Sequence, residues 1–418
     1  MAKRGVRVVL VLLLLAVLIS AAGVGLMFIA LGRQPGVSRD STLVLRLNTD
    51  LHEVPTDGVV QQLLEGTDPS GLRAVLDNLR KAKVDERVGA VLVVPTGLEA
   101  GLWGKVQEVH DAIRDFRESG KPAIAFLEYG SEREYYIASA CSRIYLMPSA
   151  TLDLDGLATY EVFLRGTLDR LGIYPDILHI GEYKTAYNML TEPDFTPAHR
   201  EMSESLVRDL FEQLVERIAE ARRKGPEEVR ALIDRGPLSA AQALEAGLVD
   251  GLAYADEIDD KVQLPGGSLR RLEADEYTRT SLGAVGLDRG PKIAVIYATG
   301  AITSGEGGFD PLMGASLGSD TITRHIRDAR GDTSIRAIVV RIDSPGGSAV
   351  ASDAIWRELV ITRDEKRDRP LVVSMSDLAA SGGYWIATAA SDIVAQPGTL
   401  TGSIGVISGK IVTGGFYE

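Results

Sequence analysis

Two glycine-rich turns in the second half of the chain contain the residues best suited to nucleophilic chemistry. Ser381 follows the apolar run 371–375 and precedes the small-residue segment 384–390, so we expect it at a corner between a buried strand and a helix. A serine hydroxyl at such a corner lies at the positive end of the helix dipole, and the following Gly382 lets a substrate approach the backbone closely. The sequence therefore favours Ser381 as a nucleophile.

A Pro-Gly-Gly turn offers a candidate oxyanion site. Gly346 and Gly347 follow Pro345, shortly after the run 337–342 (AIVVRI), which we expect to be another buried strand. The N–H groups of such a turn can point at a developing oxyanion. A Pro-Gly-Gly turn alone is weak evidence of function, but its combination with the ASGG sequence around Ser381 is much stronger.

At these motifs the chain resembles the signal peptide peptidase A family, a membrane-bound branch of the ClpP/crotonase superfamily. The motifs that carry the resemblance are RIDSPGGS, AASGGYW and PGTLTGSIG in the second half and GEYKTA in the first half. The resemblance implies that Ser381 attacks the scissile carbonyl. The N–H of Gly382, with one from Gly346 or Gly347, would then hold the oxyanion.

Lys184 and Ser403 are assigned through the same resemblance. The family places its general-base lysine in the motif GxYK, which is Gly181 to Lys184 here, and Ser403 in TGSIG matches a family position that orients this lysine. A lysine can deprotonate a serine only if burial depresses its pKa and leaves the amine neutral. By residue type alone, Lys184 would be a solvated surface group and Ser403 an ordinary turn serine.

Beyond residue 43 the chain repeats itself. The sequence YYIA at 135–138 matches YWIA at 384–387 with an offset of 249 residues, and Pro148 matches Pro397 with the same offset. Both halves alternate strand-like and helix-like segments, which predicts an α/β protein with tandem ClpP/crotonase-like domains. The predicted parts are a cytoplasmic tip, transmembrane anchor and spacer at 1–42, a first repeat at 43–262, a linker at 263–291 and a second repeat at 292–418.

The two copies differ where chemistry is expected. The position that matches Ser381 is Glu132, and the glycines that follow the serine are absent there. Ser131 lies one position away, so a small shift of the alignment would bring a serine to this place, but without the glycines we do not expect it to act. The second copy also ends early. Judged by the first copy it should extend about ninety residues further, so we interpret the chain as truncated and its second half as poorly folded.

The N-terminal segment predicts a membrane anchor. Residues 8–31 are uncharged, apolar and long enough to cross a bilayer. Lys3, Arg4 and Arg7 precede them, which predicts a cytoplasmic N-terminus and a catalytic body on the extracytoplasmic, periplasmic side of a bacterial inner membrane. A cleaved signal peptide is the alternative, but its apolar core would span only about 7–15 residues.

Several other kinds of chemistry find no support in the sequence. The net charge of -13, without a basic stripe, argues against nucleic-acid binding. No HExxH, CxxC or carboxylate cluster predicts a metal, no nucleotide-binding motif follows a strand, and we expect no cofactor. Cys141, the single cysteine, excludes an intrachain disulfide. Of the five histidines only His179, which precedes Lys184, remains as an alternative base.

The sequence and the resemblance together predict a membrane-anchored serine endopeptidase whose Ser381 and Lys184 lie in different repeats. The resemblance implies peptide substrates, namely leftover signal peptides and other apolar unfolded segments, and a homo-oligomer such as a tetramer. A crotonase-type acyl-CoA enzyme, with the same fold and a similar oxyanion hole, is one alternative. A catalytically silent membrane scaffold is the other.

Overall fold

The computed structural model describes residues 36–47, 51–53, 71–98, 102–261, 270–310 and 314–417, together with five isolated helical positions between residues 14 and 23. Most of the predicted membrane span, residues 8–31, therefore lies outside the described residues. Among those that are described, no helix is long and apolar enough to cross a bilayer. The anchor stays a prediction.

The first repeat is built on a parallel sheet of six strands. Its inner strands are nearly uninterrupted apolar runs and are largely buried, as is typical of strands covered on both faces. In spatial order the strands are β8 (Gly251–Leu252), β4 (Arg143–Leu146), β3 (Ala123–Leu127), β2 (Val88–Pro95), β1 (Ser41–Leu47) and β9 (Arg270–Glu273).

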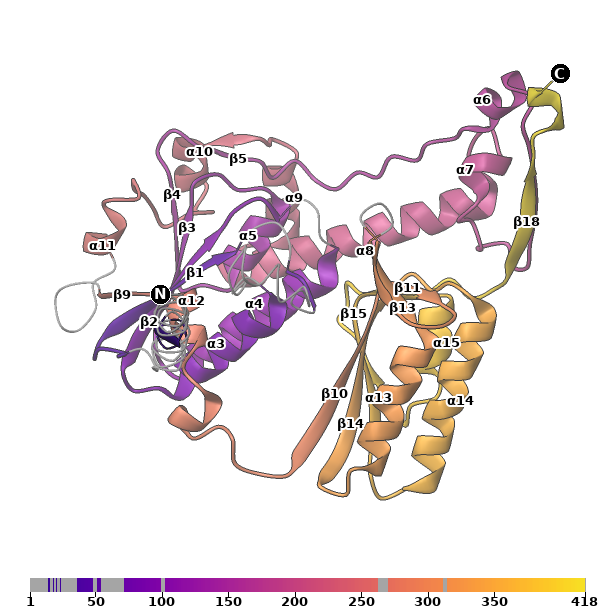
Figure 1. The fold of residues 1–418 in the computed structure, drawn as a ribbon. Coiled ribbons are helices and arrows are strands. Elements are labelled where there is room, and N and C mark those ends of the chain that lie inside the picture. Colours follow the sequence, from indigo (N-terminus) through magenta and orange to yellow (C-terminus); the bar gives the residue numbers. More distant parts are fainter. Residues whose placement is uncertain are drawn as a thin grey trace, which may run out of the picture.

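The longest helix of the first repeat, α8 (Pro197–Arg222), extends beyond the sheet (Figure 1). Thr196 caps its start by accepting a hydrogen bond from the N–H of His199, and proline is its first residue. Its second half packs on α5 (Glu132–Ser139) and is buried at Leu214 and Ile218. Further helices of this repeat are α3 (Leu72–Val84), α4 (Trp103–Arg117), α9 (Pro226–Ile233), α10 (Ala240–Glu245), α11 (Ile258–Lys261) and α12 (Ala274–Thr278).

The predicted linker, residues 263–291, contains ordered elements of the first repeat. Strand β9 pairs in parallel with β1 and so forms the edge of the first sheet. Behind it, Tyr277 of α12 is fully buried, and its hydroxyl donates a hydrogen bond to Asp85. The chain therefore leaves the first repeat later than the sequence suggested, because β9 and α12 are too short to produce a recognisable hydrophobic period.

The second repeat has its own parallel sheet and its own apolar core. Helices α13 (Ser319–Gly331) and α14 (Ala349–Glu365) pack on one face of the sheet, and α15 (Gly382–Ala387) follows strand β15. The strands, in spatial order, are β10 (Lys292–Thr299), β14 (Ile335–Ser344), β15 (Leu371–Ala380) and β16 (Asp392–Val394), with β17 (Leu400–Gly402) also paired to β15. The mixed α/β architecture with parallel sheets fits the predicted ClpP/crotonase-like fold class.

The opposite face of the second sheet is partly open. Register places Ile293 and Val295 of β10 and Val394 of β16 on the face away from α13 and α14, and these side chains are 57%, 40% and 59% exposed. An apolar sheet face of this kind is usually covered by helices. That the second half folds poorly stays a prediction, but this face is where such a weakness would lie.

A two-stranded ribbon joins the two repeats. Strand β6 (Tyr174–His179) of the first repeat pairs in antiparallel fashion with β18 (Ile407–Val412) at the end of the described chain. Figure 1 shows the first repeat sending an extended segment out to β6 and to two short helices, α6 (Arg165–Arg170) and α7 (Asn188–Thr191), beside β18. Segments more than two hundred residues apart thus meet at this ribbon.

Candidate active site

Ser381 lies at the corner between β15 and α15, as the sequence predicts, in a strained backbone conformation. It is the residue before the first turn of α15, with φ 54° and ψ -114°. A non-glycine residue in such a region costs about 1–3 kcal/mol and persists only where its neighbours impose it. Here the N–H of Ser381 donates to the carbonyl oxygen of Gly402 on β17, at 2.9 Å.

The Pro-Gly-Gly turn packs directly against this corner. Gly346 and Gly347 have φ of 95° and 154°, which favours glycine at both positions. A Cβ on Gly346 would lie 2.6 Å from the nitrogen of Gly382 and 2.8 Å from the Cβ of Ser381. No side chain fits there, so the turn and the start of α15 approach each other at backbone distance.

The hydrogen bonds around the turn distinguish its two glycines. The N–H of Gly346 donates to the hydroxyl of Ser344, at 3.1 Å. Gly347 forms a parallel β-bridge with Ile302. The N–H of Ile302 donates to the carbonyl of Gly346, and the carbonyl of Ile302 accepts the N–H of Ser348. In a parallel bridge the central residue directs its own N–H to the opposite side. The N–H of Gly347 therefore points away from Ile302, whereas that of Gly346 is already engaged.

Lys184 is buried, and its side chain reaches the second repeat. Its Nζ donates to the Ser403 hydroxyl at 2.9 Å and to the Ser403 carbonyl oxygen at 2.5 Å. The residue is only 5% exposed, and this burial lowers the pKa of the ammonium group. Neighbouring Glu182, which would favour the charged form if it faced the amine, is exposed to solvent.

The β17 strand brings Ser403 next to Ser381. Ala380 and Gly402 are register partners in the parallel pair β15–β17, and the two serines are the residues that follow them. Ser403 itself has a positive φ of 48°. Lys184 thus bonds the residue that follows the register partner of Ala380, beside Ser381, although it comes from the other repeat.

Two interlocking loops fix the lysine. The N–H of Ile180 donates to the carbonyl of Val406 at 2.9 Å, which continues the ribbon of β6 and β18. Gly405 has φ 145°, and a Cβ there would lie 2.2 Å from the carbonyl oxygen of Ile180. The GEYK loop and the GSIG loop are therefore packed against each other without room for a side chain.

The alternative residues, Ser131 and His179, make other contacts. Ser131 precedes the first turn of α5 as Ser381 precedes that of α15, so it is Ser131, one position from Glu132, that corresponds to the nucleophile. Its hydroxyl forms a capping box with the buried carboxylate of Glu134. His179 is exposed on β6, with its Nδ1 3.0 Å from the carbonyl of Gly181.

Sequence reasoning missed an ion pair between the repeats at the base of the oxyanion turn. Lys105 of α4 lies 2.7 Å from Asp343 and 3.6 Å from Asp377, and its N–H also bonds Asp377. Asp343 belongs to RIDSPGGS and accepts the N–H of Leu378 on β15. Burial alone would lower the pKa of Lys105, but the two carboxylates outweigh it and raise that pKa.

A second buried charge cluster lies beside this pair. Arg341 of β14 contacts Glu53 and Glu108 of the first repeat, each at 2.7 Å, and also the hydroxyls of Ser374 and Ser376. Burial raises the pKa of Glu108 despite the arginine, and burial likewise raises that of Asp377. The inter-repeat clusters of Lys105 and Arg341 together contain four carboxylates and two cations: Glu53, Glu108, Asp343, Asp377, Lys105 and Arg341.

Comparison with known proteins places these residues in a family context. A profile of peptidase family S49 matches residues 115–264 and 363–418. The chain is 33% identical over 371 residues to "Serine protease SPPA, chloroplastic" of Arabidopsis thaliana, covering 86% of this chain and 54% of that protein. It is 35% identical to Protease 4 of Salmonella typhi and 30% identical to Protease 4 of Haemophilus influenzae. These two alignments cover 79% of this chain and 54% and 55% of the relatives.

The chain spans just over half the length of these relatives. Lys184 lies in the first matched stretch of the family profile, and Ser381 and Ser403 lie in the second. The Pro-Gly-Gly turn falls between the two stretches. The chain has the strand–turn–helix corner and the interlocked lysine loop, and relatives of at least 30% identity match most of its length. The chain therefore belongs to peptidase family S49, together with the SPPA and Protease 4 proteins.

Proposed function

We propose that the chain acts as a serine endopeptidase with Ser381 as nucleophile and Lys184 as general base. The observation that carries the proposal is the contact of Lys184 with Ser403, next to Ser381 in the β15–β17 register. Burial lowers the pKa of this lysine, as a base that must be neutral requires. A crotonase-type acyl-CoA enzyme would need the oxyanion turn but not a buried lysine delivered by the other repeat.

In the proposed acylation step, the neutral amine of Lys184 takes the hydroxyl proton of Ser381 while the serine oxygen bonds to the scissile carbonyl carbon. The N–H groups of Gly382 and Gly347 hold the oxyanion. We choose Gly347 over Gly346 because the latter's N–H donates to Ser344. The lysine then returns the proton to the leaving amine nitrogen, the C–N bond breaks, and an ester on Ser381 remains.

In deacylation, water attacks this ester and gives its proton to Lys184, and the same two N–H groups hold the second oxyanion. Collapse of the intermediate breaks the bond to Ser381, whose oxygen recovers the proton from the lysine. Ser403 orients the amine through its hydroxyl and carbonyl oxygens in both steps. The cycle uses only groups of the chain, water and the peptide.

The proposed substrates are apolar, unfolded peptide segments, including leftover signal peptides. The support is a set of exposed apolar side chains in the two interlocked loops and the ribbon. Leu178 is 75% exposed, and Ile180 and Ile404 are each 71% exposed. A cavity of about 360 Å³ lies in the same ribbon, lined by Ile177, Tyr187 and residues 407–411. An apolar peptide would cover these side chains as it reached Ser381.

We also propose that residues 8–31 anchor the protein in a bacterial inner membrane, with a cytoplasmic N-terminus and a periplasmic body. The basic residues before this stretch support that orientation. We further propose a homo-oligomer such as a tetramer. The open apolar face of the second sheet, at Ile293, Val295 and Val394, supports association with another copy.

The test is labelling of the full chain with a fluorophosphonate probe, which reacts with activated serines. Wild type and Ser131→Ala should label at similar rates and cleave an unfolded, apolar peptide. Ser381→Ala should lose both activities, by about a thousandfold or more, with an unchanged thermal midpoint. Labelling that survives in Ser381→Ala and disappears in Ser131→Ala would reverse the assignment. Turnover of an acyl-CoA thioester instead of a peptide would favour the crotonase alternative.

A further inference from the structure

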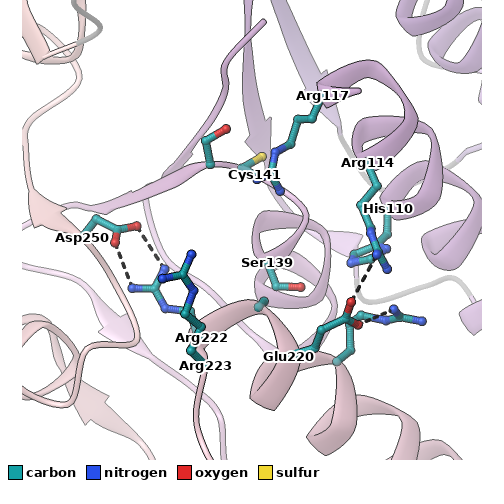
Figure 2. A pocket seen from close by; sticks show the side chains of 12 residues that line it. His110, Arg114, Arg117, Ser139, Cys141, Glu220, Arg222, Arg223 and Asp250 are labelled. Carbon is teal, nitrogen blue, oxygen red and sulfur yellow. Dashed lines mark hydrogen bonds and ion pairs between the residues drawn. The ribbon is translucent and has the colours of Figure 1, made fainter. Parts of the chain in front are cut away.

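A cavity of about 440 Å³ lies in the first repeat, away from Ser381, Lys184 and Ser403. Its walls are the last turns of α4, α5 and α8 and the turn before β8. Figure 2 shows arginine side chains directed into it from α4 and from the end of α8. The residues that line it are His110, Arg114, Arg117, Ser139, Cys141, Ser142, Arg217, Glu220, Ala221, Arg222, Arg223 and Asp250.

The cavity concentrates positive charge in an acidic protein. Five arginines and two carboxylates line it, an excess of three positive charges, whereas the whole chain has a net charge of -13. His110 adds no charge at neutral pH, because burial and nearby Arg217 lower its pKa against the opposing effect of Asp111. Guanidinium groups held this close repel one another unless anions compensate them.

The two carboxylates engage three of the arginines. Glu220 bonds both Arg114 and Arg217, at 3.1 and 2.8 Å, and Asp250 makes a two-pronged pair with Arg222, at 3.0 Å for each contact. Arg117 donates only to a neutral group here, the carbonyl of Ala140, at 2.7 Å. Within this part of the described chain, no contact joins Arg117 or Arg223 to either carboxylate of the cavity.

Helix dipoles account for part of this arrangement but not for all of it. The C-termini of α4, α5 and α8 meet at the cavity, and each contributes roughly half a negative charge. Three such ends compensate roughly 1.5 charges of the excess of three. Asp111, which contacts His110 and also acts on Arg217, compensates a further charge. The small positive excess that remains lies on Arg117 and Arg223, which no carboxylate of the cavity engages.

We propose that this cavity binds an anion of the phosphate-ester class with at least two negative charges, and that Arg117 and Arg223 are its main ligands. Guanidinium groups match the geometry of phosphate oxygens through paired N–H donors. The volume is suitable for a small phosphorylated molecule or for a phospholipid headgroup. The proposal does not depend on the peptidase mechanism, because none of the lining residues contacts Ser381, Lys184 or Ser403 in the described chain.

The test uses the full chain in a neutral detergent, titrated with pyrophosphate and followed by calorimetry and by the thermal midpoint. We expect saturable binding and a rise in the midpoint that chloride at the same ionic strength does not produce. Arg117→Gln combined with Arg223→Gln should weaken binding by about tenfold or more. Arg117→Lys with Arg223→Lys keeps the charge and should give an intermediate loss, which covers the case in which the glutamine variant folds poorly.

Arg324→Gln is the matched control, because Arg324 forms an exposed pair with Glu306 in the second repeat. It removes one positive charge far from the cavity lining and should bind pyrophosphate like wild type. Reconstitution then identifies the source of the phosphate. A headgroup ligand predicts that vesicles containing phosphatidic acid, whose phosphate monoester can carry two negative charges, abolish the pyrophosphate response and phosphatidylcholine vesicles do not. A soluble ligand predicts a response in both. A response equal to that of chloride, or unchanged in both Arg117/Arg223 variants, would overturn the proposal.

Discussion

Ser381 and Ser131 occupy the same position in their repeats, yet their hydroxyl groups have different neighbours. Ser131 donates to the buried carboxylate of Glu134, three residues further on, and that carboxylate also accepts the N–H of Leu98. In the second repeat Tyr384 stands at the corresponding position, and no capping hydrogen bond is made by Ser381. One serine thus caps a helix, whereas the hydroxyl of the other makes no capping bond and, on the proposed mechanism, attacks the substrate.

The depressed pKa of Lys184 gives a first prediction. Only the neutral amine can take the serine proton, so kcat/KM for a peptide should rise with pH. It should level off above an apparent pKa that lies below the ordinary 10.5. Lys184→Arg keeps a charge that does not dissociate and should lower activity by about a thousandfold or more. Lys184→His should recover a little activity, with its rise moved to about pH 6.5.

The measurement is a pH–rate profile of wild type and the two variants. Ser403→Ala serves as a companion, because it removes one acceptor of the lysine and should change the profile as well as the rate. A Lys184→Arg enzyme of near-normal rate would rule out the lysine as base and return attention to His179.

At the residue scale, local pattern and family resemblance each predicted a part of the candidate site. Ser381, Gly346 and Gly347 were predicted from turn chemistry after apolar strands. Lys184 was found only through resemblance, because nothing in GEYK by itself indicates burial. Lys105 was missed altogether. Its contact with Asp343 joins residues that are 238 positions apart, and the pattern of a single sequence does not reveal such a pairing.

At the scale of elements, the interlocked GEYK and GSIG loops determine where the lysine amine lies. The ribbon of β6 and β18 aligns them, and β17 connects them to the strand of the nucleophile. A ribbon of two strands is only marginally stable by itself, so the backbone contact of Gly405 with Ile180 has a large share in holding the lysine in place.

Gly405→Ala is the second prediction. The added Cβ would lie 2.2 Å from the carbonyl oxygen of Ile180, at a φ of 145° that alanine avoids. The loops should separate, and fluorophosphonate labelling of Ser381 should fall by about tenfold or more. Gly414→Ala is the control, because Gly414 lies in the same terminal segment and a Cβ there meets nothing within 4 Å. Equal labelling of both variants would mean that loop contact does not position the lysine.

The elements themselves were predicted unevenly. The apolar runs that became β14 and β15 were recognisable, since strands buried on both faces are continuous in hydrophobicity. The apolar residues of α8 are buried unevenly. Leu214 and Ile218 are buried, but Leu206 is 40% exposed, because this half of the helix extends past the sheet toward the lysine loop. Periodicity indicates an apolar face and not what covers it.

At the scale of the whole molecule, the two repeats meet through buried charge. The four carboxylates around Lys105 and Arg341 exceed the cations by two. Burial raises the pKa of Glu108 and Asp377, so the folded protein binds protons on these groups more tightly than the unfolded chain does. Their contribution to stability therefore falls as pH rises from the ordinary carboxylate range through the raised pKa values.

Glu108→Gln tests this balance as the third prediction. At pH 7 it removes a buried charge that is costly to ionise, while Arg341 keeps its partner Glu53. The free energy of unfolding should rise by about 1 kcal/mol, and the gain should vanish below about pH 4, where the unfolded chain is also protonated. Denaturant titrations at both pH values measure it.

The control for this prediction is a carboxylate whose pKa is shifted in the opposite direction, downward. Arg324 and Thr321 hold the pKa of exposed Glu306 at about 2, so Glu306→Gln should give no gain at pH 7. A Glu108→Gln protein that is less stable than wild type at pH 7 would show that the ion pair with Arg341 outweighs the cost of burial.

Membrane topology is the fourth prediction. If residues 8–31 anchor the chain with a cytoplasmic N-terminus, a reporter that works only outside the cytoplasm should be active when fused after Thr42. Replacing Lys3, Arg4 and Arg7 by glutamate should reduce that activity, because the orientation depends on these charges. Full activity of a reporter that works only in the cytoplasm would contradict the proposed orientation.

The order of the two proposed catalytic partners along the chain has a consequence for its synthesis. Lys184 precedes Ser381 by 197 residues, and Ser403 and β18 come later still. A ribosome therefore completes the base-carrying repeat long before the nucleophile exists. On the proposed mechanism, a half-made chain in the translocation channel can cleave nothing. On that mechanism, hydrolysis cannot begin before β18 has emerged and paired with β6, so other polypeptides in transit meet no assembled site while these residues are still being made.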